Sequence, residues 1–347
     1  MKSTRAATRI ALIGANGHGL HHRRHIGSLG SLVELVGLCD VLPVTDVPTG
    51  AQVFTDVAEM LKMTEPEVVI VCTPPRTHVP FALSALESGA DVLLEKPPVL
   101  DLTEHDLLQK AVARTDRVVQ VGFQGLGSSQ LPELRTLART HKPCDISIIG
   151  SWQRDDVYWS RSPWAGHLPV DGALRNPFAH YTMQALAIAG SDPIRMEVAW
   201  CRVRDIEVDD TATLRLTLAN GSRVLIAVTL AGEDMIDGVM SVGGQRHNFR
   251  ELVDRSLLLN LIEFRSGSAP LLAPLSATRG FTAIVEALGR MPMPGRLDQS
   301  VFDTAGPVRT LRGVNAVLRR CAREFALLSE IDGGWTATST GGVANIG

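Results

Sequence analysis

The stretch RIALIGANGHG, residues 9–19, decides the fold, because a short apolar run leads directly into a glycine-rich loop. If a helix follows the loop, free backbone N–H groups and the positive end of the helix dipole point into it. A dinucleotide pyrophosphate binds at such a turn when no side chain blocks its approach, which is the task of Gly14, Gly17 and Gly19. The G-x-x-G-x-G spacing alone is also compatible with a plain strand-to-helix turn.

An acidic residue follows the second apolar run of the chain, residues 32–39. This residue, Asp40, can accept hydrogen bonds from both ribose hydroxyls of a dinucleotide, and its charge repels a 2′-phosphate. Val41, Leu42 and Pro43 come next, so no arginine follows to receive such a phosphate. The pattern favours NAD over NADP, and a solvated turn aspartate is the alternative.

Glu95-Lys96-Pro97 comes directly after the apolar run 92–94, which places a lysine at the end of a strand. A hydride leaves a carbinol carbon only as its hydroxyl loses a proton. A cationic lysine stabilises the resulting charge on oxygen, and a lysine of lowered pKa can also accept the proton. Lys96 is therefore a candidate catalytic residue, with a surface salt bridge to Glu95 as the alternative.

The first half alternates short β-branched runs with helical patterns, which indicates a parallel sheet covered by helices on both faces. Ligands bind such sheets beyond the carboxyl ends of the strands, where Asp40, Thr73, Pro74, Glu95 and Gln124 all fall. The predicted strands are residues 9–13, 32–39, 53–54, 68–72, 92–94 and 118–122, and the predicted helices are 56–61, 79–88 and 102–113.

The second half reads differently. A strand at 146–153 is followed by an aromatic, basic loop containing Tyr158, Arg161 and Trp164, and then by a helix that ends near Ala189. Asn220-Gly221 predicts a hairpin between antiparallel strands. Those strands are predicted at 195–204, 211–218 and 223–230, with later helices near 281–288 and 308–326. We expect domains at 1–142 and 143–332, and a flexible tail at 333–347 that is rich in Gly, Thr and Ser.

Length, charge and composition indicate a compact protein of two domains, with 347 residues, 45% hydrophobic residues and a net charge of −3. The sequence has no basic block, and no apolar run approaches the ~20 residues of a membrane span. We therefore expect no nucleic-acid partner and no membrane association. The residues before the first strand contain no hydrophobic segment, and five scattered cysteines fit a reducing cytoplasm.

Four histidines crowd the helix that follows the glycine loop: His18, His21, His22 and His25. Metal sites need ligands that converge from several elements, and histidines within one or two turns cannot enclose an ion. We therefore expect no metal site here, and interpret the segment as a polar helix beside the cofactor phosphates.

Taken together, these motifs resemble the Gfo/Idh/MocA oxidoreductases over residues 9–328. The resemblance rests on the loop 14–19, Asp40, the segment 73–78, Glu95-Lys96-Pro97 and the segment from Gly172 to His180. It implies an α/β protein with an N-terminal Rossmann domain, a doubly wound parallel sheet, and a C-terminal α/β domain. That second domain contains a large open, mainly antiparallel sheet that commonly forms the subunit interface. Family substrates are mostly sugars, inositols and related polyols.

The resemblance, with the chemistry above, gives a candidate site. His180 suits a proton shuttle because its ordinary pKa is near neutral, and a core histidine is the alternative. The expected catalytic residues are Lys96, His180 and Asn176. The expected cofactor-binding residues are Gly14, Asn16, Gly17, His18, Gly19, Asp40, Thr73, Pro74, His78, Glu95, Lys96 and Gln124. The expected substrate-binding residues are Lys96, Tyr158, Arg161, Trp164, Asn176 and His180.

The chain departs from the family pattern on the substrate side. Asn176 stands where the family usually has an aspartate, and an amide can neither take a proton nor hold a negative charge. Met183 and Ala165 replace an acid and an arginine, and Gln124-Gly125-Leu126 lacks the usual basic residue. We expect NAD-dependent hydride transfer at a secondary carbon of a sugar, cyclitol or carbohydrate-derived metabolite. The alternatives are glycoside elimination or hydrolysis through transient oxidation, and a catalytically silent NAD-binding regulator.

Apolar residues alternate along the predicted antiparallel strands and suggest a second buried face. We expect Leu214, Leu216, Leu218, Leu225 and Ala227 to share that face, where they are too apolar for exposure. The sequence therefore predicts a homodimer or homotetramer that forms through this sheet.

Overall fold

The computed structural model describes residues 6–248 and 254–346, which divide into two compact units. Unit 1 comprises Met1–Phe123 and Ser256–Arg279, and unit 2 comprises Gln124–Arg255 and Gly280–Gly347. The expected boundary at residue 142 is therefore wrong. Residues 124–142 include α5 (Leu131–Thr140), which packs against α7 (Ala179–Ala189) of unit 2.

The chain returns to unit 1 after residue 255 because two sets of contacts hold α8 (Leu257–Arg265) there. The Gln120 side chain donates to the Leu257 carbonyl at 2.7 Å and to Asn260 Oδ1 at 3.0 Å. Arg265 forms ion pairs with Glu67, at 2.8 Å, and with Asp91. These long-range bonds attach a helix from late in the sequence to the first sheet.

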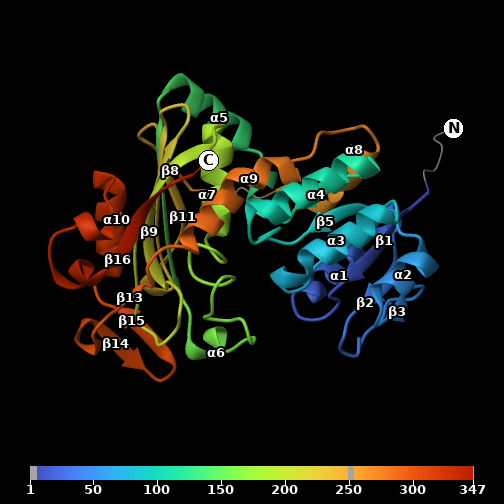
Figure 1. The fold of residues 1–347 in the computed structure, drawn as a ribbon, viewed down its shortest axis with the longest axis horizontal. Helices are drawn as coiled ribbons and strands as arrows, with labels where there is room; N and C mark the ends of the chain where they lie inside the picture. The colour runs from blue at the N-terminus through green and yellow to red at the C-terminus, as the bar shows by residue number, and fades with distance from the viewer. Residues whose placement is uncertain (1–5, 249–253, 347) are drawn as a thin grey trace. The chain divides into compact units, whose positions relative to one another are not determined.

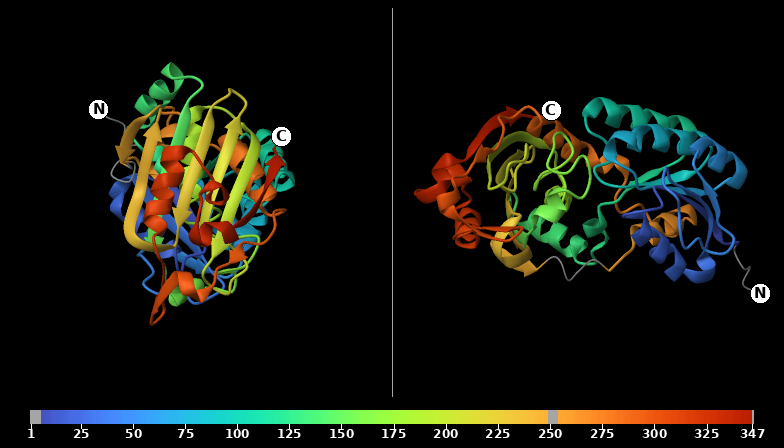
Figure 2. Two further views of the ribbon diagram at one scale, coloured as in Figure 1. Left: turned by 90° about the vertical axis from the view of Figure 1, so that its left-hand side faces the viewer. Right: turned by 90° about the horizontal axis from the view of Figure 1, so that it is seen from below.

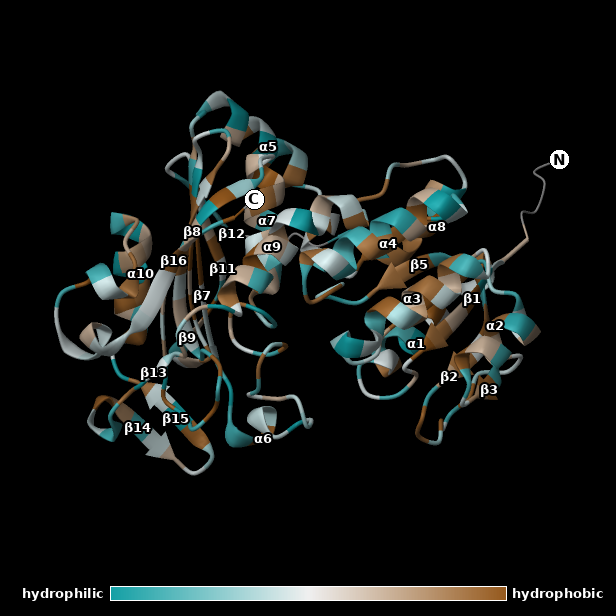
Figure 3. Cartoon of the chain, in the orientation of Figure 1, coloured by the Kyte–Doolittle hydropathy of each residue, from teal (hydrophilic) through white to brown (hydrophobic). Residues whose placement is uncertain are grey.

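Unit 1 contains a six-stranded parallel sheet in the order β3-β2-β1-β4-β5-β6, which confirms the predicted doubly wound fold. Apart from the exposed β3, its strands are nearly all buried, and the apolar strands appear brown in Figure 3. The strands are β1 (Thr8–Ile13), β2 (Val33–Cys39), β3 (Gln52–Phe54), β4 (Val68–Val71), β5 (Asp91–Leu94) and β6 (Val119–Val121). The helices are α1 (Gly19–Ser28), α2 (Val57–Thr64), α3 (His78–Glu87) and α4 (Leu102–Thr115), with α8 and the 3₁₀ turns η1 (Gly30–Leu32), η2 (Pro75–Thr77) and η5 (Leu275–Thr278) (Figure 1).

Two of these helices begin at aspartate caps. Asp56 accepts a hydrogen bond from the Glu59 N–H at 2.7 Å, and Asp101 accepts one from the Glu104 N–H at 2.8 Å. Each carboxylate satisfies a backbone donor that the helix cannot, and it lies at the positive end of the helix dipole.

Unit 2 is built on a large mixed sheet in the order β12-β11-β7-β10-β9-β8-β13, with β16 also paired to β8. Most pairs are antiparallel, as expected, whereas β10 runs parallel to β7 and β13 runs parallel to β8. The strands are β7 (Asp145–Gln153), β8 (Pro193–Arg202), β9 (Thr211–Leu218), β10 (Arg223–Thr229), β11 (Ala231–Val242), β12 (Gln245–Asn248), β13 (Gly295–Arg296) and β16 (Thr340–Asn345), beside a separate hairpin of β14 (Phe302–Ala305) and β15 (Val308–Leu311). The remaining elements are α6 (Asp156–Trp159), α9 (Arg279–Leu288), α10 (Val314–Glu324), η3 (Gln124–Gly127), η6 (Gln299–Val301), η7 (Leu328–Glu330) and η8 (Gly334–Thr338).

Two sequence predictions for the C-terminal part are wrong. The expected tail at 333–347 instead contains β16, which pairs antiparallel with β8 over Thr340–Asn345. The expected helix at 308–326 begins only at Val314, because Val308–Leu311 is a strand. Gly313 separates the two elements with a φ of 71°, a conformation that favours glycine.

The five apolar residues assigned to one open sheet face are buried on two different faces. Leu225 pairs with Arg215 and Ala227 pairs with Thr213, whereas Leu214 pairs with Ile226. Since side chains alternate along a strand, Leu225 and Ala227 lie on the face opposite to Leu214. All five side chains are at most 1% exposed within the single chain. The premise of the predicted subunit interface is therefore wrong.

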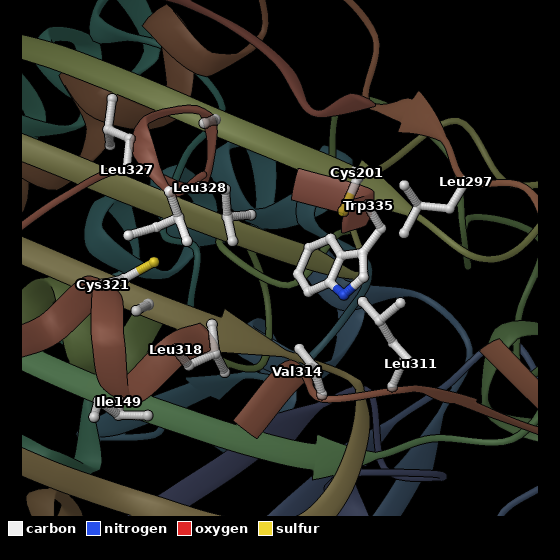
Figure 4. Close-up of a cluster of buried hydrophobic side chains, with 14 of the residues drawn as sticks. Ile149, Cys201, Leu297, Leu311, Val314, Leu318, Cys321, Leu327, Leu328 and Trp335 are labelled. Atoms are coloured by element: carbon white, nitrogen blue, oxygen red, sulfur yellow. The ribbon is translucent and has the colours of Figure 1, made fainter. Parts of the chain in front are cut away.

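The chain itself covers the face that carries Leu225 and Ala227 (Figure 2, left). Trp335, Leu318 and Cys321 pack there in one buried cluster, shown in Figure 4. The cluster also contains Ile149, Ala199, Cys201, Val203, Ala231, Ile236, Leu297, Phe302, Leu311, Val314, Leu327, Leu328 and Ile331. On the same face, Arg215 donates to Glu330 at 2.7 Å and to Glu197 at 3.1 Å. No helix among the described residues is long and apolar enough to cross a membrane.

Candidate cofactor and substrate sites

The glycine loop between β1 and α1 has no room for side chains at two of its glycines. A Cβ atom at Gly14 would lie 2.2 Å from the Cys72 carbonyl oxygen, and Gly14 adopts a φ of 86°. A Cβ atom at Gly19 would lie 1.9 Å from the Gly14 carbonyl oxygen. Gly17 faces open space with a φ of 53°. The loop therefore presents bare backbone at the start of α1, as a bound pyrophosphate requires.

Asp40 lies at the end of β2 and contacts this loop directly. Its Oδ2 accepts a hydrogen bond from the Asn16 N–H at 3.0 Å, and its Oδ1 accepts one from the Leu42 N–H at 2.9 Å. The structure thus brings together two residues that the sequence assigned to the cofactor. A carboxylate beside the phosphate loop is placed to accept hydrogen bonds from ribose hydroxyls.

Glu95 follows β5 and is buried against α1. Its Oε1 lies 2.9 Å from His22 Nε2 and 3.7 Å from His18 Nε2, and its Oε2 accepts the Lys96 backbone N–H at 3.2 Å. Burial by itself would raise the pKa of Glu95. The hydrogen bond from His22 and the charges of His22, Lys96 and His18 outweigh that effect and lower the pKa to about 2. Glu95 is therefore an ionised acceptor beside the candidate catalytic lysine.

His22 was not predicted as a site residue. Its signal in the sequence is its spacing, since His18 and His22 are four residues apart and share one face of α1. The ligand atoms of His18, His22 and Glu95 lie within 4.8 Å of one another, a convergence that the histidine pattern alone did not predict. Within the cluster, His22 Nε2 and Glu95 Oε1 lie at hydrogen-bonding distance, 2.9 Å. His25 turns elsewhere and contacts Ser256 Oγ at 2.6 Å.

His78 ties two loops of unit 1 together. It is 1% exposed, its Nδ1 lies 2.8 Å from the Pro97 carbonyl oxygen, and its Nε2 lies 2.8 Å from the Thr73 carbonyl oxygen. Burial is the main cause that lowers the pKa of His78. The ring is enclosed between two backbone carbonyls, and a neutral imidazole donates to one of them, so this geometry favours positioning of Thr73 and Pro97 over direct cofactor contact.

In unit 2, the predicted aromatic and basic side chains gather around Tyr158. The Arg161 guanidinium lies 3.8 Å from the Tyr158 ring centroid and 4.6 Å from that of Trp164. Arg154 lies on the same Tyr158 ring at 5.3 Å and on Trp152 at 4.9 Å. Burial is the main cause that raises the pKa of Tyr158 to about 12, so its phenol stays protonated. The cluster therefore consists of two guanidinium groups that lie on aromatic rings and are attracted to them by cation–π interactions.

Asp171, which the sequence did not single out, is the hydrogen-bonding centre of this region. Its side chain is 0% exposed. Its Oδ1 accepts from Arg161 Nη2 and from Asn176 Nδ2, each at 2.9 Å, and its Oδ2 accepts the Gly166 N–H at 2.8 Å. One carboxylate therefore joins two predicted substrate-binding residues.

The segment between Asp171 and Asn176 is fixed to the body of unit 2. A Cβ atom at Gly172 would lie 2.5 Å from Asp209 Oδ1. Asp209 accepts the Leu174 N–H at 3.0 Å and pairs with Arg175 at 3.6 Å, both side chains being at most 1% exposed. Arg175 in turn lies over the Trp200 ring at 5.3 Å. These contacts fix the backbone between Asp171 and Asn176.

The predicted site residues thus fall into two groups, one in each unit. Lys96 and the cofactor-binding candidates other than Gln124 belong to unit 1, and His180, in the first turn of α7, belongs to unit 2 with Asn176. Gln124 is exposed and opens η3 at the start of unit 2. Gly122 was not predicted as a site residue either. A Cβ atom at this position would lie 2.9 Å from Glu95 Oε2, so the glycine leaves room for the Glu95 carboxylate.

Comparisons with known proteins agree with this division. Residues 8–123 match the Gfo/Idh/MocA model, described as an oxidoreductase family with an NAD-binding Rossmann fold. Inositol 2-dehydrogenase 4 of Saccharopolyspora erythraea is 33% identical over 133 residues, 37% of this chain and 39% of that protein. The rhizopine catabolism protein MocA of Rhizobium meliloti is 23% identical over 229 residues, 63% of this chain and 70% of that protein.

Among solved structures, the WlbA dehydrogenase of Bordetella pertussis, in complex with NADH and UDP-GlcNAcA, matches with a TM-score of 0.72. The identity is 20%, and the match covers 82% of this chain and 96% of that one, so the likeness concerns the fold. The resemblance inferred from the motifs is confirmed for the first unit: residues 8–123 match the NAD-binding Rossmann domain of the Gfo/Idh/MocA oxidoreductase family.

Proposed function

We propose that the protein is an NAD-dependent dehydrogenase or reductase that acts on a secondary carbinol or keto carbon of a sugar, a cyclitol or a related carbohydrate. The observation that carries the proposal is the contact between two motifs in unit 1. Glu95 precedes Lys96 at the end of β5, and its carboxylate bonds His22 of the helix that the glycine loop opens. The candidate catalytic lysine is thereby tied to the phosphate-binding element.

Unit 1 would hold the cofactor. The loop at Gly14, Gly17 and Gly19 would receive the pyrophosphate, with Asn16 and His18 beside it, and Asp40 would accept the ribose hydroxyls. Thr73 and Pro74 at the end of β4 would border the cofactor, as would the exposed Gln124 of unit 2. Bound NAD would supply the acceptor or donor of the hydride.

The reacting oxygen of the substrate would be handled by Lys96. Its ammonium group stabilises negative charge on that oxygen as the proton leaves, and Glu95 holds the Lys96 backbone in place. His180 would move or share a proton, and Asn176 would orient a hydroxyl. Tyr158, Arg161 and Trp164 would bind the rest of the substrate. Carbohydrates fit such a surface because rings stack on aromatic faces while hydroxyls take hydrogen bonds.

Two further properties belong to the same proposal. The five cysteines are free, which fits a reducing cytoplasm. A homodimer or homotetramer would have to use a surface other than the face carrying Leu225 and Ala227, because residues between 297 and 335 cover it.

The proposal is tested by an activity screen. Purified protein is mixed with NAD or NADP and a panel of inositols, free sugars, glycosides and nucleotide sugars, and reduced nicotinamide is followed by absorbance. We expect turnover with at least one secondary alcohol and a preference for NAD. Keto-sugars with NADH test the reverse direction. Binding of NADH without turnover in either direction would contradict the proposed dehydrogenase activity.

A further inference from the structure

Position 176 carries an asparagine where the related family usually has an aspartate. A carboxylate is nevertheless close by, because Asp171 contacts the Asn176 amide directly. Asn176 Nδ2 donates to Asp171 Oδ1 at 2.9 Å, and Asp171 is fully buried. An ionised carboxylate only accepts hydrogen bonds, whereas an amide has one face that donates and one that accepts. Asp171 therefore fixes which face of the Asn176 amide points toward it.

The same carboxylate oxygen also sets the direction of Arg161. The Arg161 guanidinium donates to Asp171 Oδ1 at 2.9 Å and to the Tyr158 carbonyl at 2.7 Å, and it stacks on the Tyr158 ring. A planar guanidinium held by two acceptors and an aromatic ring has little rotational freedom. The Gly166 N–H, at 2.8 Å from Oδ2, holds the carboxylate itself.

We infer that Asp171 is the positioning residue of the substrate end of the site. It orients the Asn176 amide and the Arg161 guanidinium together, and it makes asparagine the required partner at position 176. The inference rests on the proposed function, because it gives a role to two residues of the proposed substrate site.

The inference explains why an acid at position 176 does not suit this chain. The Asn176→Asp change would place two carboxylate oxygens at the 2.9 Å separation now occupied by a donor and an acceptor. Like charges so close cannot both ionise readily, and the pair would share one proton. A protonated carboxyl group introduced at position 176 can donate to Asp171 as the amide does, whereas an ionised one cannot.

Other charged or titratable groups lie near Asp171 and Asn176 and contribute to the electrostatic field there. Arg161 and Tyr158 come from the segment after β7, and Asp209, paired with Arg175, comes from the loop before β9. His180 lies in the first turn of α7, and His167 is held by Glu207 at 3.2 Å. The Asn176→Asp variant keeps all of these groups and the Asp171 charge that acts on Tyr158 and Asp209, so a new pH dependence in that variant reports on the carboxylate pair.

The test compares the wild type with Asn176→Asp, Asp171→Asn and the double variant Asp171→Asn/Asn176→Asp, which exchanges acid and amide. Asp205→Asn is the matched control, because its side chain is 79% exposed in the same unit. The first readout is kcat/KM against pH, with the secondary alcohol that turns over fastest in the screen. The second is the thermal unfolding midpoint against pH, which needs no substrate.

We expect each single variant to lose roughly ten- to a hundredfold in kcat/KM at pH 8, the size of effect for a lost hydrogen bond to a charged group. Asn176→Asp should regain most of its activity and its unfolding midpoint as the pH falls toward 5.5. The exchanged variant should lose that pH dependence, because one donor and one acceptor are again opposed at positions 171 and 176. It should regain activity only in part, since the amide nitrogen at position 171 then also faces the Arg161 donor.

Two results would overturn the inference: single variants within threefold of the wild type, or an Asn176→Asp loss that is equal at all pH values in both readouts. If Asp171→Asn does not fold, Asn176→Asp alone still tests the pair. Absence of turnover by the wild type would count against the proposed function only, because the unfolding midpoints test the carboxylate pair independently.

Discussion

Glu95 in unit 1 and Asp171 in unit 2 are both buried carboxylates bonded to predicted site residues, and the two differ in their partners. Glu95 in unit 1 is bonded to His22 and lies near His18, so its side-chain neighbours are imidazole rings of α1. Asp171 in unit 2 accepts hydrogen bonds from a guanidinium (Arg161), an amide (Asn176) and a backbone N–H. The Glu95 carboxylate is therefore held by imidazole rings of one helix, whereas the Asp171 carboxylate joins three different kinds of N–H donor from its own loop.

The largest effect on turnover is expected from a substitution of Lys96, the residue next to Glu95 in unit 1. Lys96→Ala should lower turnover by about two to four orders of magnitude, because charge on the reacting oxygen loses its stabilising cation. Affinity for NADH, measured by fluorescence titration, should change far less, since the phosphates are held at the glycine loop. A Lys96→Ala enzyme within tenfold of wild-type turnover would remove Lys96 from the chemistry.

The next effect concerns the histidine of unit 2. His180→Ala should cost about ten- to a thousandfold in kcat/KM and should shift the pH profile, because a proton shuttle is lost. His167→Ala is the matched control, since His167 is 57% exposed and pairs only at the surface with Glu207. If both variants show the same pH profile as the wild type, His180 is not the shuttle.

A smaller effect is expected on the free energy of unfolding, through the charge of Glu95. The pKa of Glu95 in the folded protein is about 2, below its ordinary 4.5, so the carboxylate stabilises the fold above pH 4.5. That contribution is lost as the pH falls from 4.5 toward 2. His22→Ala removes the main opposing hydrogen bond, so burial raises the pKa and the acid unfolding limb moves to higher pH.

The measurement is chemical denaturation at a series of pH values. His22→Ala should lose about 1–3 kcal/mol near pH 7, as expected when a buried charged group loses a hydrogen bond. His21→Ala, an exposed neighbour on α1, serves as control and should match the wild type. Identical acid limbs for the His22→Ala variant and the wild type would show that His22 does not set the charge of Glu95.

The smallest effect concerns cofactor choice. Asp40→Ala should narrow the preference for NADH over NADPH, because a carboxylate that accepts ribose hydroxyls and repels a 2′-phosphate is gone. Calorimetric titration with both cofactors gives the ratio directly. Equal affinities in the wild type would show that Asp40 does not select the cofactor.

The sequence predicted the Rossmann sheet well because its signals are local. The run 9–13, the glycines at 14–19 and the strand before Glu95 each report their own conformation, and the observed β1, α1 and β5 agree with them. The faces of the second sheet could not be predicted in this way. The side on which Leu225 lies relative to Leu214 depends on the register between β9 and β10, which a single strand does not encode.

The substrate end was predicted only in part for a related reason. Tyr158, Arg161 and Asn176 were found from residue type and from the family resemblance. In the structure Arg161 stacks on Tyr158, and it shares the Asp171 carboxylate with Asn176. Asp171 was missed because residues 160–178 form no helix or strand, so no periodicity places it beside Arg161 and Asn176. Likewise, α8 joins unit 1 through contacts with Gln120 that lie 137 residues away in sequence.

The central claim, direct hydride transfer between a secondary carbinol carbon and NAD, is tested most directly by isotope transfer. A substrate from the screen is prepared with deuterium on the reacting carbon and incubated with NAD and the wild-type enzyme, and the nicotinamide is analysed by mass spectrometry. The account predicts deuterium in the reduced nicotinamide with the wild type, and far less product with Lys96→Ala. Product formation with no deuterium in the nicotinamide would contradict it.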